Sequence, residues 1–353
     1  MKGKKKDYLL LKIATIFLVI LFLFIAQRSF DAYILRILNL SGIYVILGVS
    51  LNLINGFTGQ FSLGHAGFMA IGAYASALLY MSPELKEVNY FIAPLIWPFS
   101  VIQVPFVFSL IFAGLLSAGV GFLVGAPCLR LKGDYLAIVT FGFSEIIRVL
   151  FNNLQSITNG PLGLKGLPTY TNLWWSWGIA IFTIWFIKNL VNSSYGRALK
   201  SIREDEVAAE AMGVNLFYHK VLSFVVGAFF AGIGGALLGS LLMTIDPNSF
   251  GFAMTFQIII IVIVGGLGSI AGSVIVGILF AILMEVLRAV ESPMNILGLK
   301  IPGIPGMRML IFSILLMIVV LFFQQGLMGT REWSWEWLHH KLTRTKKELE
   351  EGS

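Results

Sequence analysis

The sequence predicts an all-α integral membrane protein, and three features of its composition support this. Hydrophobic residues make up 57% of the 353 residues and charged residues only 12%, against about 25% in soluble domains. The mean hydropathy is +0.86. A soluble protein of this size would expose much of that apolar surface to water, so the composition excludes a soluble globular protein, a disordered chain and a coiled coil. The single cysteine, Cys128, excludes a secreted module held by internal disulfides.

Apolar runs of about 20 residues, the length that crosses the hydrocarbon core, recur along the chain. We expect about ten transmembrane or re-entrant helices. They are placed at residues 8–26, 33–54, 62–81, 103–128, 134–152, 173–191, 218–243, 252–266, 268–290 and 307–326. The run 252–266 is too short for a full crossing and is a candidate for a half-helix that re-enters the membrane. The first run has no small-residue cleavage site after it, so it is expected to be a retained anchor.

The distribution of basic residues predicts the orientation of the chain, because cytoplasmic loops of membrane proteins carry an excess of lysine and arginine. Lysines crowd the residues before the first apolar run, and the longest loop and the C-terminal tail are also basic. The resulting division is a basic cytoplasmic N-terminus at 1–7, a membrane domain at 8–330 with a cytoplasmic segment at 192–217, and a cytoplasmic tail at 331–353. The net charge of +7 forms no long basic stripe, so nucleic-acid binding is not expected.

The cytoplasmic segment contains the signals of a short surface helix. Its alanines and Met212 favour a helix, and Gly213 is a suitable residue just beyond the end. Acidic side chains at the start, where they complement the helix dipole, are those of Glu204, Asp205 and Glu206. The small side chains of Ala208 and Ala209 permit close docking of another protein. An ordinary solvated loop helix remains the alternative interpretation.

These residues also carry a resemblance. The pattern Ala208-Ala209-x-x-x-Gly213 resembles the coupling-loop motif Glu-Ala-Ala-x-x-x-Gly of ABC importer permeases, although Val207 stands in the place of the glutamate. Longer runs resemble the permease family of branched-chain amino-acid ABC importers, in its LivM-type branch, between about residues 40 and 330. Those runs lie at residues 52–68, 158–164, 196–199, 202–206 and 265–272.

The resemblance implies a multi-pass subunit of a bacterial cytoplasmic (inner) membrane, with both termini cytoplasmic. Its expected partners are a LivH-type permease, two ABC ATPase subunits at the cytoplasmic face and an external substrate-binding protein. The chain contains no G-x-x-x-x-G-K-S/T phosphate loop. We therefore expect no catalysis and no cofactor in this chain, and ATP with magnesium in the partner subunits. The expected ATPase-coupling residues are Arg197, Arg203, Glu204, Asp205, Glu206, Ala208, Ala209, Met212 and Gly213.

Two glycine-rich stretches, 56–68 and 265–269, interrupt the expected helices. Irregular backbone at membrane depth is tolerated only against protein or a water-lined cavity, so these stretches are candidates for the translocation path. Close packing of helices through small residues is the competing interpretation. The candidate path residues are Asn52, Gly59, Gln60, Ser62, Gly64, His65, Gly265, Gly266, Gly268 and Ser269. No second histidine lies near His65 in the sequence, so no metal site is expected.

Two pairs of opposite charges stand three residues apart in expected spans. Glu145 and Arg148 form one pair, and Glu285 and Arg288 form the other. This spacing places each pair on one helix face, where the side chains can pair. Charges within a membrane also suggest function, so a gate or a contact with the binding protein stays open for both pairs. The glycine- and proline-rich outer loops 153–172 and 291–306 are further candidates for that contact.

A secondary transporter and a membrane enzyme are the functions that compete with the importer. An ion-gradient-driven secondary transporter would need coupling carboxylates near the middle of the membrane, whereas Glu145 and Glu285 stand near the ends of their expected spans. A membrane enzyme is disfavoured by the absence of an HEXXH motif and of clustered histidine and aspartate. The expected substrates are branched-chain or similar hydrophobic amino acids, with urea and short amides as the alternative.

Overall fold

The computed structural model describes residues 21, 23–131, 133–291, 294–296 and 299–301, and isolated positions between 306 and 329. The expected N-terminus at 1–7 and the tail at 331–353 lie outside the described residues, as does most of the expected span 8–26. The span expected at 307–326 is described only at isolated positions. All statements of structure below refer to the described residues.

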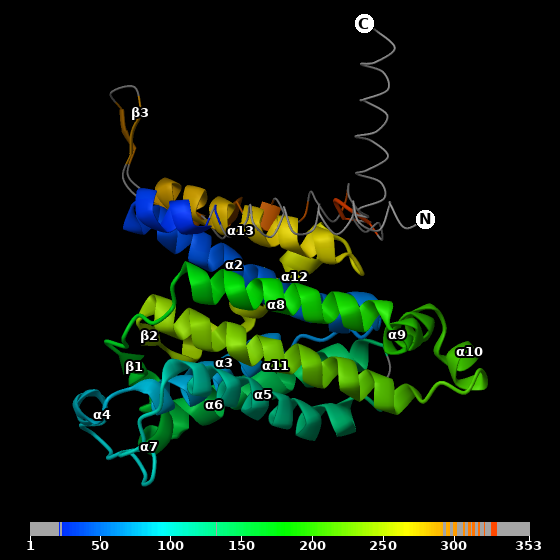
Figure 1. Cartoon of the computed structure of the whole chain (residues 1–353), viewed down its shortest axis with the longest axis horizontal. Coiled ribbons are helices and arrows are strands. Elements are labelled where there is room, and N and C mark those ends of the chain that lie inside the picture. The colour runs from blue at the N-terminus through cyan, green and yellow to red at the C-terminus, as the bar shows by residue number, and fades with distance from the viewer. Residues whose placement is uncertain are drawn as a thin grey trace, which may run out of the picture.

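The chain folds into a bundle of long helices that run roughly side by side (Figure 1). Every span expected between 33–54 and 268–290 coincides with a helix, which confirms the all-α membrane fold. The helices are α2 (Ala32–Asn52, continued by the π-helix η1, Leu53–Phe57), α3 (His65–Tyr80), α5 (Phe106–Cys128), α6 (Asp134–Asn153), α8 (Leu173–Asn192), α11 (Leu216–Leu242), α12 (Phe252–Gly265) and α13 (Ile270–Glu291). The described helices that are long and apolar enough to cross a membrane are α2 with η1, α5, α6, α11 and α13.

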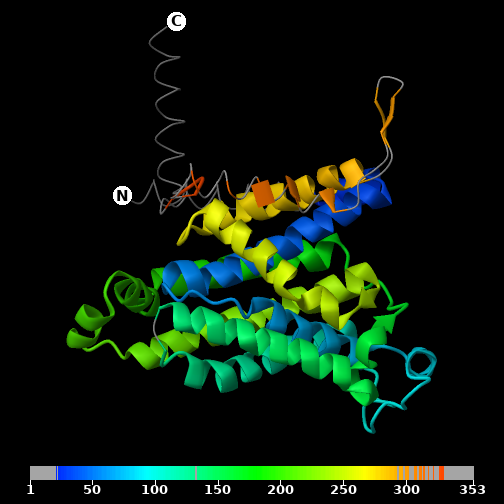
Figure 2. The same cartoon turned by 180° about the vertical axis from the view of Figure 1, so that it is seen from behind.

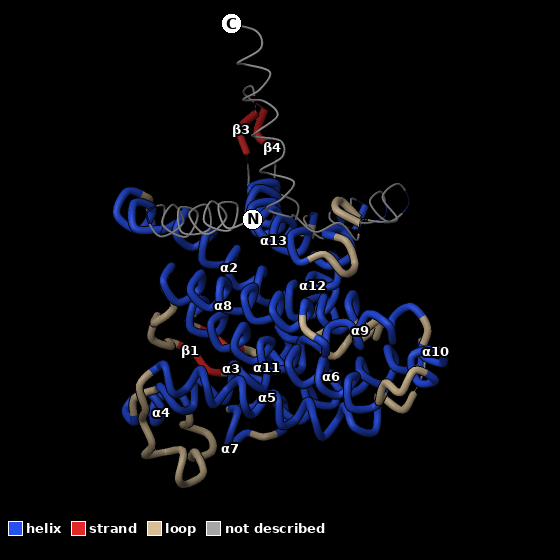
Figure 3. Tube along the Cα trace, turned by 45° about the vertical axis from the view of Figure 1, so that its right-hand side comes forward, coloured by secondary structure: helices blue, strands red, loops and turns tan. Residues whose placement is uncertain are grey.

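The two ends of the bundle differ in structure (Figures 1 and 3). One end carries the short helices α9 (Ser194–Glu204) and α10 (Glu206–Ala211). The other end carries α4 (Pro83–Asn89), α7 (Gln155–Thr158), the 3-10 helices η2 (Gly160–Leu162) and η3 (Pro247–Phe250), and the paired strands β1 (Leu164–Lys165) and β2 (Thr244–Ile245). A hairpin of β3 (Met294–Ile296) and β4 (Leu299–Ile301) follows α13. We refer to these as the α9 end and the β1 end.

Small residues allow the central helices to approach closely. Helix α3 is buried at every position from His65 to Tyr80, and α11 packs against it and against α5. A Cβ atom at Gly72 of α3 would lie 2.0 Å from the carbonyl oxygen of Gly232 in α11. One at Gly235 would lie 2.1 Å from the carbonyl oxygen of Met69. Backbone contact through glycine is typical of helix association in membranes, where apolar burial gives no driving force.

The peripheral helices expose large apolar side chains, as expected of surfaces that face lipid or another membrane subunit. Leu115 and Leu123 of α5 are 60% and 70% exposed, and Ile138 of α6 is 65% exposed. In water such faces would be unfavourable. The sequence composition and the fold therefore agree on a membrane environment.

Helix α12 is short but does not turn back to the side from which it came. It has 14 residues and follows β2 and η3 at the β1 end, whereas the turn after it lies at the α9 end (Figure 2). Gly268 in that turn stands beside Arg203 of α9. The stretch from β2 to Gly268 therefore crosses the bundle, with irregular structure supplying the first part. This replaces the expectation of a re-entrant half-helix at 252–266.

Candidate coupling and translocation site

The short helix expected before Gly213 is present as α10. Its N-cap is Asp205, whose carboxylate accepts hydrogen bonds from the backbone N–H groups of Val207 (2.8 Å) and Ala208 (3.1 Å). This arrangement satisfies amide groups that the first turn of a helix leaves without partners. Gly213 takes a positive φ of 85° after the helix, a conformation that favours glycine. The sequence signals for both ends of α10 are confirmed.

The exposed surface around α10 is largely apolar, with Glu210 as an exposed acidic residue on it. Val207 and Met212 are 71% and 84% exposed, whereas Ala209 is buried against the rest of the chain. The flanking carboxylates have partners within the chain: Glu204 pairs with Arg203 and Glu206 with Lys220, each at 2.5 Å. The surface around α10 that is open to another molecule therefore combines exposed alanine, valine and methionine side chains with the exposed carboxylate of Glu210.

Arg203 points into the bundle and not toward that surface. Its Nη1 donates a hydrogen bond to the carbonyl oxygen of Gly56 in η1 (3.2 Å). A Cβ atom at Gly59 would lie 2.9 Å from Cγ of Arg203, and one at Gly268 would lie 2.7 Å from its Nη1. One side chain of the cytoplasmic segment thus contacts both of the glycine-rich stretches. Arg197, which precedes Arg203 on α9, is exposed.

Asn52 joins the two glycine-rich stretches to each other. Its Nδ2 donates to the carbonyl oxygens of Ser269 (2.9 Å) and Gly266 (3.3 Å) and to Oγ of Ser273 (2.7 Å). Its Oδ1 accepts from the backbone N–H of Gly268 (2.9 Å). The side chain is fully buried, and both ends of its amide are satisfied. Asn52 therefore fixes the turn between α12 and α13 against the end of α2.

The middle of the first glycine-rich stretch, residues 58–64, is a non-helical segment between η1 and α3. The expected span 62–81 begins as a helix only at His65. Before it, the backbone N–H of Ser62 donates to Oδ1 of Asn55 (3.1 Å), and that of Leu63 donates to Oγ1 of Thr140 in α6 (3.0 Å). A Cβ atom at Gly64 would lie 2.9 Å from the carbonyl oxygen of Thr140. This stretch lies at the α9 end and is held by α6 and η1.

The glycines and the polar residues of these stretches have different surroundings. A Cβ atom at Gly265 would lie 2.7 Å from the backbone of Gly272, so this glycine serves helix packing. By contrast, neither amide atom of Gln60 has a hydrogen-bond partner in the described chain, although Gln60 is only 3% exposed. His65 bonds Oγ of Ser50 through Nε2 (3.0 Å), while its Nδ1 has no partner there. Buried polar atoms without partners are rare, so Gln60 and His65 are the stronger path candidates.

Both expected charge pairs form. Arg148 lies 2.7 Å from Glu145 on α6 and also donates to Oδ1 of Asn248 in η3 (3.0 Å). Arg288 lies 3.2 Å from Glu285 on α13. The first pair therefore ties a span to a distant loop element, whereas Glu285 of the second pair also meets Tyr33 of α2. Asn248 was not predicted from the sequence, because nothing in a loop sequence indicates which helix it meets.

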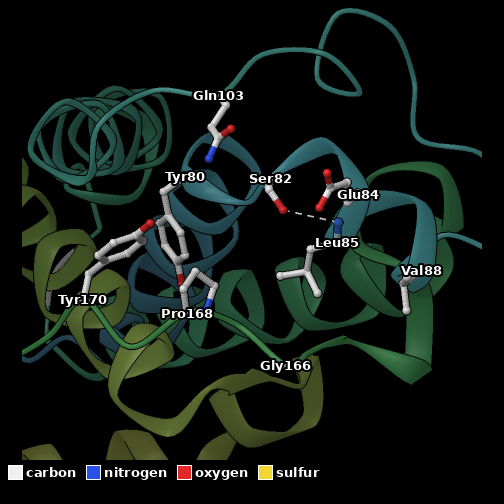
Figure 4. A pocket seen from close by; sticks show the side chains of 9 residues that line it. All are labelled: Tyr80, Ser82, Glu84, Leu85, Val88, Gln103, Gly166, Pro168 and Tyr170. Atoms are coloured by element: carbon white, nitrogen blue, oxygen red, sulfur yellow. Dashed lines mark hydrogen bonds between the residues drawn. The ribbon is translucent and has the colours of Figure 1, made fainter.

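A cavity of about 450 Å³ opens at the β1 end, between α4 and the loop after β1 (Figure 4). Tyr80, Glu84, Gln103 and Tyr170 are among its lining residues. Next to it, Lys86 is buried and donates to the carbonyl oxygens of Phe99 (2.8 Å) and Ile102 (2.5 Å), and burial lowers the pKa of its ammonium group. These bonds anchor the loop that frames the cavity.

Residues 33–321 match the family described as the permease component of branched-chain amino acid transport systems. The chain belongs to this permease family. It is 33% identical over 286 residues to the high-affinity branched-chain amino acid transport system permease protein LivM of Escherichia coli, covering 71% of this chain and 63% of LivM. The match therefore spans less than two thirds of that relative. These findings confirm the family suggested by the sequence motifs.

Two further relatives show the breadth of the similarity. A probable LivM of Methanocaldococcus jannaschii is 26% identical over 81% of this chain and 90% of that protein. LivH of Escherichia coli, also a branched-chain amino acid permease protein, is 24% identical over 74% of this chain and 85% of that protein. No solved structure matches the chain.

Several residues of this site escaped the sequence analysis. Asn55, Thr140 and Ser50 hold the first glycine-rich stretch, and Lys220 pairs with Glu206. Each is a common polar residue within an apolar span or at its end, and Asn55 lies within the run 52–68, which does not show what its side chain contacts. A buried polar residue in a span is a weak signal of a partner, but the sequence does not identify that partner.

Proposed function

We propose that this chain is the LivM-type membrane subunit of an ATP-driven importer of branched-chain amino acids. Its relatives are named as permease proteins of branched-chain amino acid transport. In this proposal it forms half of the translocation path with a LivH-type permease, two ATPase subunits bind at the α9 end, and an external binding protein docks at the β1 end. ATP with magnesium is bound by the ATPase subunits, and this chain supplies no catalytic group.

The contact of Arg203 with both glycine-rich stretches is the observation that supports this mechanism best. A displacement of α10 by an ATPase moves α9, from which Arg203 reaches Gly56 and stands beside Gly268. The same side chain therefore transmits motion to the ends of α2 and α12. Non-helical backbone can absorb such a change more easily than a continuous helix. Alternating access of the translocation path to the two sides of the membrane then follows from movement of the two glycine-rich stretches.

The charge distribution supports the orientation. Arg197, Lys200 and Arg203 lie on α9, and the positive-inside rule places this end in the cytoplasm. Accessibility to a membrane-impermeant maleimide tests this directly, since the native Cys128 is buried. Glu84→Cys is expected to react in intact cells and Met212→Cys only after the membrane is opened. The reverse pattern contradicts the orientation.

The assembly and the energy source are tested together. The tagged chain is purified gently from its native membrane, and accompanying proteins are identified by mass spectrometry. We expect P-loop ATPases and a second homologous permease. The reconstituted complex is then tested for uptake of labelled leucine with internal ATP and with a collapsed ion gradient. Uptake by this chain alone without ATP would replace the importer with a secondary transporter.

The substrate is tested in the same vesicles. Excess isoleucine and valine are expected to compete with labelled leucine, whereas urea and short amides are expected to leave its uptake unchanged. Competition by urea or an amide, with no effect of the amino acids, would assign the permease to that substrate class and leave the coupling mechanism intact.

A further inference from the structure

A second cavity, of about 170 Å³, lies at the α9 end, next to the contact of Arg203 with the glycine-rich stretches. Three membrane helices meet at its wall: Phe57 ends η1, Asn192 ends α8 and Ile270 begins α13. Two basic side chains of α9, Lys200 and Arg203, complete the lining. Because spans end where the hydrocarbon gives way to lipid headgroups, this cavity lies at headgroup level.

The cavity has an excess of positive charge. Arg203 is paired with Glu204, whose side chain is 71% exposed. Lys200 has no carboxylate within 4.0 Å in the part of the chain that the structure describes. Its ammonium group lies 5.9 Å from the centre of the Phe57 ring, a distance at the outer limit of a cation–π contact. A lysine in this setting retains donors for an anion.

Size restricts the class of anion. Pockets for drug-sized ligands enclose about 300–1,000 Å³, and this cavity is smaller. It admits a phosphate-sized group, with Lys200 and the second proton of the Nη1 atom of Arg203 as donors. The side-chain amide of Asn192, another lining residue, is a further donor. Anionic headgroups are attracted to basic residues at the cytoplasmic surface.

We propose that this cavity binds a phosphate group, supplied by an anionic phospholipid of the cytoplasmic leaflet or by free phosphate. Lys200 is its principal ligand. The site lies against Arg203, which also bonds Gly56. An occupied site therefore holds α9 against the end of η1, so lipid composition or phosphate adjusts the transmission between α10 and the membrane helices.

Amine labelling of the wild-type complex tests the proposal without a variant. The assembled transporter is placed in nanodiscs of phosphatidylcholine, of phosphatidylcholine with phosphatidylglycerol, or of phosphatidylcholine with added inorganic phosphate. Limited labelling of Lys200 is compared by mass spectrometry with that of Lys188, which is on α8 outside the cavity. We expect phosphatidylglycerol to slow labelling of Lys200 about fivefold relative to Lys188.

The three conditions separate the possible sources. Protection by phosphatidylglycerol alone identifies a lipid headgroup, and protection also by inorganic phosphate identifies a site for free phosphate. Equal labelling of Lys200 in all three conditions overturns the proposal.

Matched variants give an independent test. Lys200→Gln and Lys188→Gln each remove one positive charge near the same membrane surface. Native mass spectrometry of the complexes is expected to show phosphatidylglycerol retention reduced about fivefold in Lys200→Gln and unchanged in Lys188→Gln. An equal reduction in both would indicate only diffuse attraction to the surface and would refute the site.

Discussion

Arg203 of α9 donates a hydrogen bond across 3.2 Å to the carbonyl oxygen of Gly56, a residue 147 positions earlier in the chain. Gly56 lies in η1, where α2 changes from an α-helix to a π-helix, and π-helical turns occur often at functional sites. The bond places the cytoplasmic segment in direct contact with a membrane helix at the point where that helix is least regular. A signal from the cytoplasm therefore has a short physical route into the bundle.

Replacement of Arg203 is expected to separate ATP hydrolysis from transport. Arg203→Gln removes the charged donor, and a hydrogen bond from a charged group contributes about 1.5–3 kcal/mol. Uptake by the reconstituted complex should fall about tenfold, while ATP hydrolysis and copurification of the ATPases persist, because Arg203 points inward. Arg203→Lys should also be defective, since an ammonium group does not reproduce the planar guanidinium geometry. Normal uptake in both variants would exclude transmission through this residue.

Arg197→Gln is the matched comparison on the same helix. Arg197 is exposed and is a predicted contact of the ATPase. Its loss should reduce copurification of the ATPase subunits and leave the remaining complexes coupled. If both variants show the same defect, the two arginines do not have the separate roles assigned to them.

Asn52 is expected to be important for stability. Asn52→Asp keeps the shape of the side chain but replaces an NH2 group, whose two hydrogens serve the oxygens of Gly266, Ser269 and Ser273, with an acceptor that carries negative charge. Unpaired buried polar groups cost about 1–3 kcal/mol each, and more when charged. We expect a clear loss of folded protein on heating in detergent. Asn153→Asp is the control, because Asn153 is exposed and bonds only one carbonyl on its own helix; an equal loss there would contradict the role of Asn52.

The sequence predicted what depends on near neighbours in the chain. Apolar runs gave the helices, the i, i+3 spacing gave the pairs Glu145–Arg148 and Glu285–Arg288, and cap residues gave the ends of α10. Each of these predictions depends on residues that are close in the sequence, within one or two turns of a helix. For the same reason the start of α3 at His65 was missed, because the apolar run continues through residues that the structure holds in a non-helical conformation.

Contacts between distant residues could not be predicted. The bond between Asn52 and Gly268 joins positions 216 apart, and no local rule specifies which of many small and polar residues face each other. The glycine-rich stretches were correctly identified as irregular, but their meeting at Arg203 required the packing of α9 against η1. The sequence left open whether 252–266 crosses the membrane, because hydropathy gives the length of an apolar run and not the irregular chain that completes a crossing.

The exposed surface of α10 is the predicted docking site for an ATPase, and Met212 tests it best. Met212→Trp changes a side chain that is 84% exposed, so the fold should be unchanged while ATPase copurification falls about tenfold or more, as for a central interface residue. Gly213 is a poorer position for a bulky residue, because its positive φ strains any side chain. The loss of stability in Gly213→Ala shows the effect of that strain without the bulk of a large side chain.

The control for Met212 lies at the other end of the molecule. Val88 is an apolar side chain of α4 that is 72% exposed at the β1 end, so Val88→Trp should leave ATPase copurification intact. If Met212→Trp retains its ATPases as fully as Val88→Trp does, the α10 surface is not the docking site.

The two charge pairs should contribute differently to stability. Arg148 bonds both Glu145 and Asn248 of η3, whereas Arg288 bonds Glu285 at 3.2 Å with its own side chain 55% exposed. Arg148→Ala is therefore expected to lower stability by about 1–2 kcal/mol. Arg288→Ala is expected to lower it by about 0.5–1 kcal/mol, because the guanidinium is screened by solvent while Glu285, only 12% exposed, keeps Tyr33 as a partner. Heat denaturation in detergent, followed by the fraction of monodisperse protein, compares them.

An exchange of Glu145 and Arg148 distinguishes pairing from gating. The double variant keeps an ion pair on α6 but moves the guanidinium one turn away from Asn248, so it should recover only part of the stability lost in Arg148→Ala. Full recovery would mean that the bond to η3 contributes nothing. Normal stability with abolished leucine uptake would instead assign this pair to a gate. A static ion pair needs only that the two charges are close, whereas a gate that moves also depends on which position carries which charge.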